Sequence, residues 1–279
     1  MNTKMVRYIL CRMLGVEAAL LLVPVLVAVI YQEKCGIVFL IPIGILCLLF
    51  WVAGRKRPEY GQIYGKEGMV IVALAWILWS LFGAMPFTLS GYIPSYVDAF
   101  FETVSGFTTT GSSIIPAVEP LQHGILFWRS FTHWIGGMGV LVFVLVVTSL
   151  DRKNSMYLMR AEVPGPEKDK LVPKAMSTAR ILYGMYLILT VIEMVFLVIG
   201  GMNLFDSMIF SFGSAGTGGF SNYADSVAHF NSAYIDGVIT VFCALFGVNF
   251  ALFYFMILGD FKSILKNEEL KTYVLLIAG

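Results

Sequence analysis

The sequence predicts an all-α membrane protein that crosses the bilayer several times, with two N-terminal helices followed by two parallel repeats. Composition gives the first reason, because 58% of the 279 residues are hydrophobic and only 13% are charged, whereas a soluble domain carries roughly a quarter of charged residues. The second reason is that the apolar residues come in long runs. The third is that two stretches, 98–111 and 206–219, align with each other without a gap.

Six segments reach or approach the ~20 apolar residues that cross the hydrocarbon core of a bilayer. The predicted spans are 7–31, 36–54, 68–90, 121–150, 176–200 and 233–258. The segments near 96–107 and 204–213 lie between spans and are too short to cross, which suits helices that enter the membrane and leave on the same side. We therefore divide the chain into two N-terminal helices (1–60), a first repeat (61–155), a second repeat (156–262) and the start of a third repeat that is cut short (263–279).

Positive charge predicts the orientation. Lysine and arginine gather before the first span and in the connections that follow the second, fourth and sixth spans, and all of these fall on one side of the membrane. The positive-inside rule makes that side cytoplasmic and places the N-terminus there. The opposite face carries seven acids, Glu33, Asp98, Glu102, Glu119, Asp206, Asp225 and Asp236. They either form an acidic mouth that concentrates cations or simply reflect the same charge bias.

The two aligned stretches have the same layout. Each reads as a short helix followed by a run of threonine, serine and glycine, ending at Gly111 in one stretch and at Gly219 in the other. Potassium ions shed water in a narrow pore, and backbone carbonyls replace that water when glycine lets the chain adopt unusual φ and ψ angles. The pattern predicts a cation selectivity filter, although a pair of flexible turns is the alternative.

The motifs resemble those of one family of K⁺-uptake proteins. Residues 100–113, FFETVSGFTTTGSS, are similar to the first pore loop of the TrkH/KtrB superfamily (Trk/Ktr/HKT), and residues 216–221, GTGGFS, are similar to its second. Residues 164–171 and 178–180, together with the two extra N-terminal spans, resemble the TrkH branch in particular.

The resemblance implies K⁺ uptake through a pore in the cytoplasmic (inner) membrane, without enzyme chemistry, cofactor or nucleic acid. It also implies a homodimer in the lipid bilayer and a cytoplasmic nucleotide-binding regulatory subunit that is TrkA-like. Members of this family fold four such units around one pore, whereas this chain supplies two, the N-terminal half. Because each strand keeps one matched glycine, we expect looser discrimination between K⁺ and Na⁺ than in tetrameric K⁺ channels. The residues implied to hold K⁺ are Thr108, Thr109, Thr110, Gly111, Thr217, Gly218, Gly219 and Phe220.

The residues leave three alternative functions open, and also the roles of Arg129 and of the glycines of 136–139. The chain could be a remnant that does not transport, or a half-pore that pairs with another chain. A membrane cytochrome is the third, since His123 and His133 lie ten residues apart on one span. Arg129 is expected to be a structural anchor that either snorkels to the interface or pairs with Glu119 or Asp98, or else an ion gate. The glycines of 136–139 indicate close helix packing or a hinge.

Overall fold

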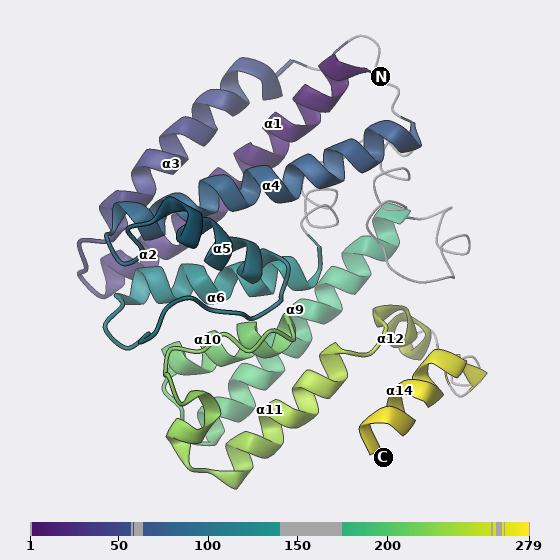
Figure 1. Cartoon of the computed structure of the whole chain (residues 1–279). Coiled ribbons are helices and arrows are strands. Elements are labelled where there is room, and N and C mark those ends of the chain that lie inside the picture. The colour runs from purple at the N-terminus through teal and green to yellow at the C-terminus, as the bar shows by residue number, and fades with distance from the viewer. Residues whose placement is uncertain are drawn as a thin grey trace.

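The computed structural model describes residues 2–56, 58, 64–139, 175–257, 259–260, 264 and 266–278, and this part of the chain is built of helices (Figure 1). Within these described residues, four helical segments are long and apolar enough to cross a membrane: Thr3–Ile30, Gly36–Gly54, Gly65–Leu89 and Ile181–Ile199. The predicted all-α membrane architecture is therefore confirmed.

The two N-terminal spans form a hairpin. The first consists of α1 (Thr3–Leu20) and α2 (Leu22–Ile30), which are separated at Leu21 because Pro24 has no N–H with which to bond the carbonyl one turn earlier. The second consists of α3 (Gly36–Leu49) and one π-helical turn, Phe50–Gly54. Both agree with the predicted spans 7–31 and 36–54.

Each repeat then runs in the predicted order of a helix, a short helix, a non-helical segment and a further helix. We call the two non-helical segments, residues 108–115 and 216–223, the first and second strands, although neither is a β-strand. In the first repeat α5 packs between α4 and α6, and in the second α10 packs against α6, α9 and α11. Helix α6 therefore lies between the two short helices and joins the repeats (Figure 1). The first repeat contains α4 (Gly65–Leu89), α5 (Tyr96–Phe107) and α6 (His123–Gly137), and the second contains α9 (Ala175–Ile199), α10 (Leu204–Ala215), η3 (Ser226–Phe230) and α11 (Ala233–Phe246).

One predicted span is wrong. Instead of a continuous helix over 233–258, α11 ends at Phe246 and a separate α12 covers Phe250–Ile257. Tyr273 of α14 (Glu268–Ala278) packs against Gly247 at this break, and its hydroxyl donates a hydrogen bond to the Ala244 carbonyl at 2.9 Å. The predicted span 121–150 is seen as α6 as far as Gly137, and its second half and the motif at 164–171 lie outside the described residues.

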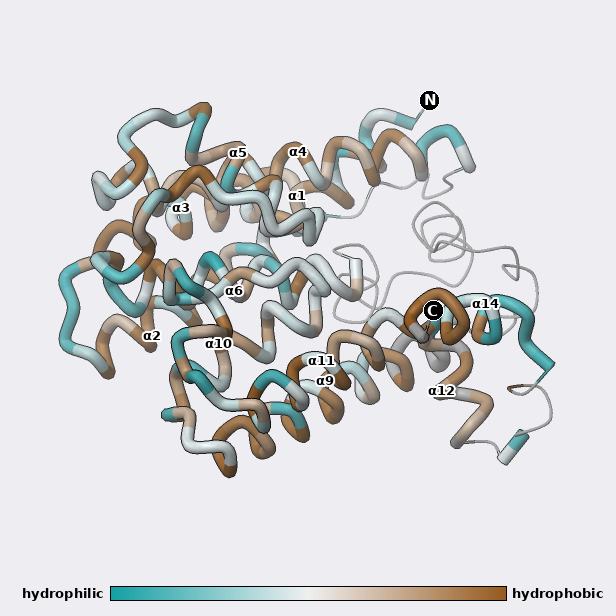
Figure 2. Tube along the Cα trace, turned by 60° about the horizontal axis from the view of Figure 1, so that its bottom comes forward, coloured by the Kyte–Doolittle hydropathy of each residue, from teal (hydrophilic) through white to brown (hydrophobic). Residues whose placement is uncertain are grey.

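Most residues of the long helices are hydrophobic, and hydrophilic residues gather near the helix ends (Figure 2). On α3 and α9, large apolar residues such as Leu40, Leu48, Ile188 and Val195 are exposed, as expected where a helix faces lipid. The interior holds Trp79, Phe107 and Trp128, each fully buried, and the Trp128 indole N–H donates to the Gly83 carbonyl at 2.9 Å. This packing fixes α5 between α4 and α6.

Candidate functional site

The two short helices have the same length and the same ends. Both have 12 residues, and their first residues, Tyr96 and Leu204, align when Gly111 is aligned with Gly219. Ser95 caps α5 by accepting a hydrogen bond from the Asp98 N–H at 3.4 Å, and Asn203 caps α10 by accepting one from the Asp206 N–H at 2.8 Å. A polar cap followed by an acid in the first turn is a strong helix start, so the sequence itself fixes where each short helix begins.

Both helices also end in a Schellman motif, in which two N–H groups beyond the helix turn back to its last carbonyls. After α5, the Thr109 N–H donates to Gly106 and the Thr110 N–H to Ser105, both at 3.0 Å. After α10, the Thr217 N–H donates to Ser214 at 2.8 Å and the Gly218 N–H to Gly213 at 3.1 Å. Donors and acceptors of the second motif stand at the positions that align with those of the first.

The strands that follow share an unusual backbone. Thr109 and Thr217 have φ of 57° and 54°, and Gly111 and Gly219 both have φ of 79°. Glycine adopts positive φ readily, but a residue with a Cβ loses roughly 1–2 kcal/mol there. Strain held at equivalent positions of two repeats is typical of a functional segment. Positive φ at alternate residues also lets successive carbonyls turn to one side of the strand.

The two strands meet at their glycines. A methyl group on Gly111 would overlap the Gly218 carbonyl oxygen, and one on Gly218 would lie 2.9 Å from the Thr109 carbonyl oxygen. Nothing lies within 4 Å of the corresponding position on Gly219. The contact therefore requires glycine at 111 and 218, while Gly219 is needed for its backbone conformation.

The eight residues implied to hold K⁺ lie together, but they differ in their surroundings. Thr108, Thr110, Thr217 and Gly219 are exposed, and the hydroxyls of Thr108 and Thr110 are 2.8 Å apart. Phe220 is buried. Its ring packs against other side chains, and its carbonyl oxygen would lie 2.7 Å from a Cβ on Gly213 of α10. Thr108, Thr110, Thr217 and Gly219 are therefore open on this side, whereas the Phe220 ring is not.

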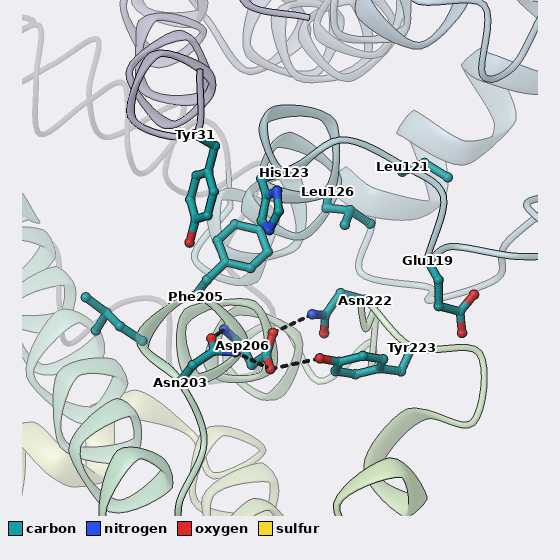
Figure 3. A pocket seen from close by; sticks show the side chains of 11 residues that line it. Tyr31, Glu119, Leu121, His123, Leu126, Asn203, Phe205, Asp206, Asn222 and Tyr223 are labelled. Carbon is teal, nitrogen blue, oxygen red and sulfur yellow. Dashed lines mark hydrogen bonds between the residues drawn. The ribbon is translucent and has the colours of Figure 1, made fainter. Parts of the chain in front are cut away.

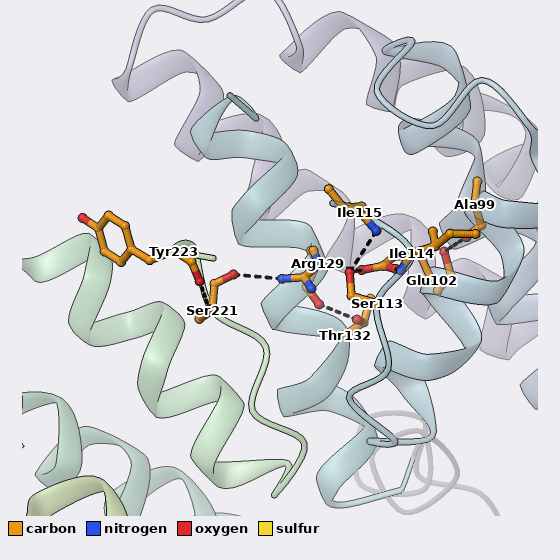
Figure 4. A network of polar contacts seen from close by, with 10 residues as sticks. Ala99, Glu102, Ser113, Ile114, Ile115, Arg129, Thr132, Ser221 and Tyr223 are labelled. Atoms are coloured by element: carbon orange, nitrogen blue, oxygen red, sulfur yellow. Dashed lines mark hydrogen bonds and ion pairs between the residues drawn. The ribbon is translucent and has the colours of Figure 1, made fainter. Parts of the chain in front are cut away.

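Glu102 holds the strand that leaves the first helix end. This carboxylate in the middle of α5 is fully buried and accepts hydrogen bonds from the Ser113 hydroxyl at 2.9 Å and from the Ile114 N–H at 2.8 Å (Figure 4). A buried carboxylate needs such donors because it has lost its water. Glu102 therefore fixes the chain just beyond Gly111.

Asp206 does the same for the second strand. Its oxygens accept hydrogen bonds from the Asn222 amide at 2.6 Å, the Tyr223 hydroxyl at 3.0 Å and the Asn203 amide at 2.8 Å. This cluster lines a cavity of about 360 Å³ that is also bordered by His123 and Phe205 (Figure 3). The two repeats thus use acids from different turns of their short helices for one purpose.

Arg129 of α6 connects the two strands. Its Nε donates to Glu102 Oε1 at 2.7 Å, its Nη1 donates to the Ser221 carbonyl at 2.9 Å, and its guanidinium carbon lies 3.7 Å from the centre of the Phe220 ring (Figure 4). The expected partners, Glu119 and Asp98, are wrong. A buried arginine in an apolar helix signals that a carboxylate must lie near it, but only the packing of α5 against α6 identifies that carboxylate as Glu102.

Three of the seven acids expected at the mouth accept hydrogen bonds from backbone N–H groups, and Asp206 accepts them from side chains. Glu102 and Asp206 act as described, and Glu119 accepts the Ala224 N–H at 2.7 Å, a hydrogen bond that lowers the pKa of this carboxyl. Glu33 accepts the N–H groups of His123 at 2.9 Å and Gly124 at 3.1 Å. These carboxylates therefore have structural roles, although Glu119 is exposed, as Asp225 and Asp236 are.

The two histidines of α6 have separate surroundings. The His123 ring lies 2.8 Å from Glu33 Oε1 and stacks on Tyr31 with ring centres 3.9 Å apart. The His133 ring is fully buried against Phe220 and against Gly218. Ten residues of helix separate them by about 15 Å, so they cannot coordinate one haem iron from its two faces. The glycines between the helices pack closely, since a methyl on Gly137 would lie 3.0 Å from the Ala215 carbonyl oxygen.

Glu33 makes the start of α6 sensitive to pH. Burial acts to raise the pKa of this carboxyl, but the hydrogen bonds from His123, Gly124 and Cys35 outweigh burial and hold the pKa below its ordinary 4.5. A lowered pKa in the folded state stabilises the protein above the ordinary pKa, and this contribution is lost as pH falls through the folded-state pKa. We expect Glu33→Gln to lower stability at pH 7 by about 1–2 kcal/mol.

Thermal unfolding in detergent between pH 7 and pH 3 measures this effect. The difference between the wild-type protein and Glu33→Gln should shrink as the pH falls below 4.5. Asp225→Asn is the matched control, because the Asp225 side chain is 58% exposed and exposed ion pairs contribute little. A difference that stays constant across this pH range would contradict the assignment.

Comparison with known proteins agrees with this geometry. Residues 39–278 match the family model TrkH, described as a cation transport protein. The Trk system potassium uptake protein TrkH of Escherichia coli (strain K12) is 36% identical over 259 residues, which cover 91% of this chain and 51% of that protein. TrkG of the same strain, also a Trk system potassium uptake protein, is 33% identical over 286 residues, with 100% of this chain and 59% of that protein covered.

A solved structure agrees as well. The crystal structure of the potassium transporter TrkH from Vibrio parahaemolyticus superposes with a TM-score of 0.82 at 28% identity, covering 99% of this chain and 57% of that one. The chain spans about half the length of the curated relatives that it matches.

Fold and site together define a class: a membrane protein with repeated modules in which a short helix leads into a strained glycine-containing strand. Within that class, the chain belongs to the TrkH family of cation transport proteins.

Proposed function

We propose that this chain supplies two of the filter strands of a Trk-type K⁺-uptake pore. The observation that carries the proposal is the matched backbone, in which a threonine with positive φ at 109 and 217 is followed two residues later by a glycine with φ of 79°. The family relationship adds that relatives about twice as long are potassium uptake proteins.

The chemistry is ion dehydration and coordination. Carbonyl oxygens of 108–111 and 217–219 replace the water around K⁺, with the threonine hydroxyls beside them. The C-terminal ends of α5 and α10 add partial negative charge where an ion would lie. The transport step is permeation down the electrochemical gradient, so the protein makes and breaks no covalent bond and is not an enzyme. Phe220 supports the second strand through its side chain.

The proposal extends to the orientation of the protein in the membrane, to its partners and to the remaining strands of the pore. Basic residues at the start of the chain support a cytoplasmic N-terminus in the cytoplasmic membrane. A homodimer and a TrkA-like nucleotide-binding subunit on the cytoplasmic side are the partners that the family relationship supports. Because the chain covers about half of its relatives, the other filter strands come from sequence beyond these 279 residues or from another chain.

Expression of the native gene in bacteria that lack their own K⁺ uptake tests the function. We expect growth at micromolar K⁺ and uptake of ⁸⁶Rb⁺ that K⁺ inhibits more strongly than Na⁺ does. Discrimination should be looser than in tetrameric K⁺ channels, because each strand has one glycine with positive φ. Membrane-inserted protein without any uptake would overturn the proposal and favour the remnant, whereas channel-grade selectivity would contradict only the expectation of loose discrimination.

A further inference from the structure

The buried pair of Glu102 and Arg129 reaches from one repeat into the other. The Glu102 side chain is 0% exposed and the Arg129 side chain is 4% exposed. Charges taken out of water must be paired and hydrogen-bonded to be tolerated. Neither side chain can therefore leave this arrangement without leaving the other charge uncompensated, which makes the pair a rigid element rather than a surface contact.

The contacts of this pair form one continuous connection. The Ser113 hydroxyl donates to Glu102, Glu102 accepts the Arg129 Nε–H, and the Arg129 Nη1–H donates to the Ser221 carbonyl, with distances of 2.9, 2.7 and 2.9 Å (Figure 4). Ser113 comes two residues after Gly111, and Ser221 comes two residues after Gly219. The connection therefore joins equivalent positions of the two strands.

The second repeat has no counterpart of this pair. The alignment of Gly111 with Gly219, continued along the chain, places Phe210 at the position of Glu102 and Gly237 at the position of Arg129. Asp206 holds only its own strand, through Asn222 and Tyr223. Together with Glu102, Arg129 thus joins the segments beyond both glycines, whereas Glu119 of the first repeat bonds only the Ala224 N–H of the second.

We propose that Arg129 is a positioning residue for ion selectivity: by bonding Glu102 with one nitrogen and Ser221 with another, it fixes the separation of the two filter strands. The inference rests on the proposed function. Its physical basis is that selection between ions by carbonyls depends on where those oxygens are held, and a planar guanidinium donates in two fixed directions at once whereas an ammonium group does not.

Arg129→Lys tests the proposal because it keeps the positive charge beside Glu102 but removes the fixed second donor to Ser221. The preference is measured as the ratio of the strengths with which K⁺ and Na⁺ inhibit ⁸⁶Rb⁺ uptake. We expect this ratio to fall about tenfold, because one charge-assisted hydrogen bond is lost. Uptake should remain measurable, and the amount of folded protein in the membrane should stay within about twofold. Ser113→Ala, which removes only one of the three donors to Glu102, should lie between the wild-type protein and Arg129→Lys.

Trp128→Phe is the matched control. Trp128 is the neighbour of Arg129 on α6 and is fully buried, but its hydrogen bond goes to Gly83 of α4 rather than to a strand. Because the Trp128 ring also packs against Phe107 at the end of α5, the substitution should lower thermal stability, with a smaller loss of ion preference than Arg129→Lys. An unchanged preference in Arg129→Lys, or an equal loss in Trp128→Phe, would overturn the inference and leave the proposed function standing. Uptake by the wild-type protein without any preference for K⁺ would overturn both.

Discussion

Gly111→Ala is expected to reduce K⁺ uptake at least tenfold. The substitution places a Cβ where φ is 79°, which costs roughly 1–2 kcal/mol. The same Cβ would overlap the Gly218 carbonyl oxygen, and overpacking of this kind adds roughly 1–3 kcal/mol. Since the atom in the way belongs to the backbone of the second strand, relief requires that both strands move. Initial rates of ⁸⁶Rb⁺ uptake, corrected for the amount of protein in the membrane, measure the effect.

Substitutions at two other glycines distinguish the effect of backbone strain from the effect of steric overlap. Gly219→Ala has the same φ of 79° but no atom within 4 Å of the new Cβ, so we expect a smaller loss than for Gly111→Ala. Gly91→Ala has φ of 81° with equally open space, in the turn after α4, and should lower stability without changing ion preference. Equal losses of uptake in Gly111→Ala and Gly91→Ala would show that general destabilisation, not the filter, explains the result.

Gly136→Ala is expected to destabilise the protein and to impair uptake. A methyl group there would overlap the Phe107 carbonyl oxygen and lie 2.8 Å from the Phe107 carbonyl carbon, at the last residue of α5. Helix α6 would then be pushed away from the end of the first short helix, at a cost of roughly 1–3 kcal/mol. Thermal unfolding in detergent, followed by size-exclusion fluorescence, gives the stability, and ⁸⁶Rb⁺ uptake gives the function.

Gly44→Ala provides the comparison for this second prediction. Gly44 also lies inside an apolar helix, α3, but nothing is within 4 Å of its Cβ position. Alanine is favoured over glycine in a helix by up to ~1 kcal/mol, so this variant should be neutral or slightly more stable. If Gly136→Ala were as well tolerated as Gly44→Ala, then the close approach of α6 to α5 would not be what positions the first strand.

The local parts of the architecture were accessible from sequence patterns alone. Apolar runs predicted the N-terminal hairpin, and length predicted the short helix over 96–107, which the structure places at Tyr96–Phe107. The failure at 233–258 has a cause that apolar length could not reveal, because α11 ends beside Gly247, where Tyr273 packs. Glycine within an apolar run is compatible with a continuous helix, and the contact of Tyr273 with this break joins residues that are far apart in the sequence.

The polar network was not accessible in the same way. The sequence places Arg129 near the outer end of its span, with Glu119 or Asp98 as expected partners, and it groups Glu102 with the acids of a solvent-facing mouth. Sequence spacing gives which residues share a helix face, but the partner of Arg129 sits on a different helix, and its Ser221 contact lies 92 residues away.

The sequence by itself determined the membrane class, the short helices and the repeated threonine and glycine positions, because apolar length, helix caps and glycine are local signals. Only the tertiary structure decided that Gly111 meets Gly218, that Phe220 turns inward, and that one arginine connects the two strands. Those features depend on how α5, α6 and α10 pack, and packing is set by close contacts among side chains far apart in the sequence.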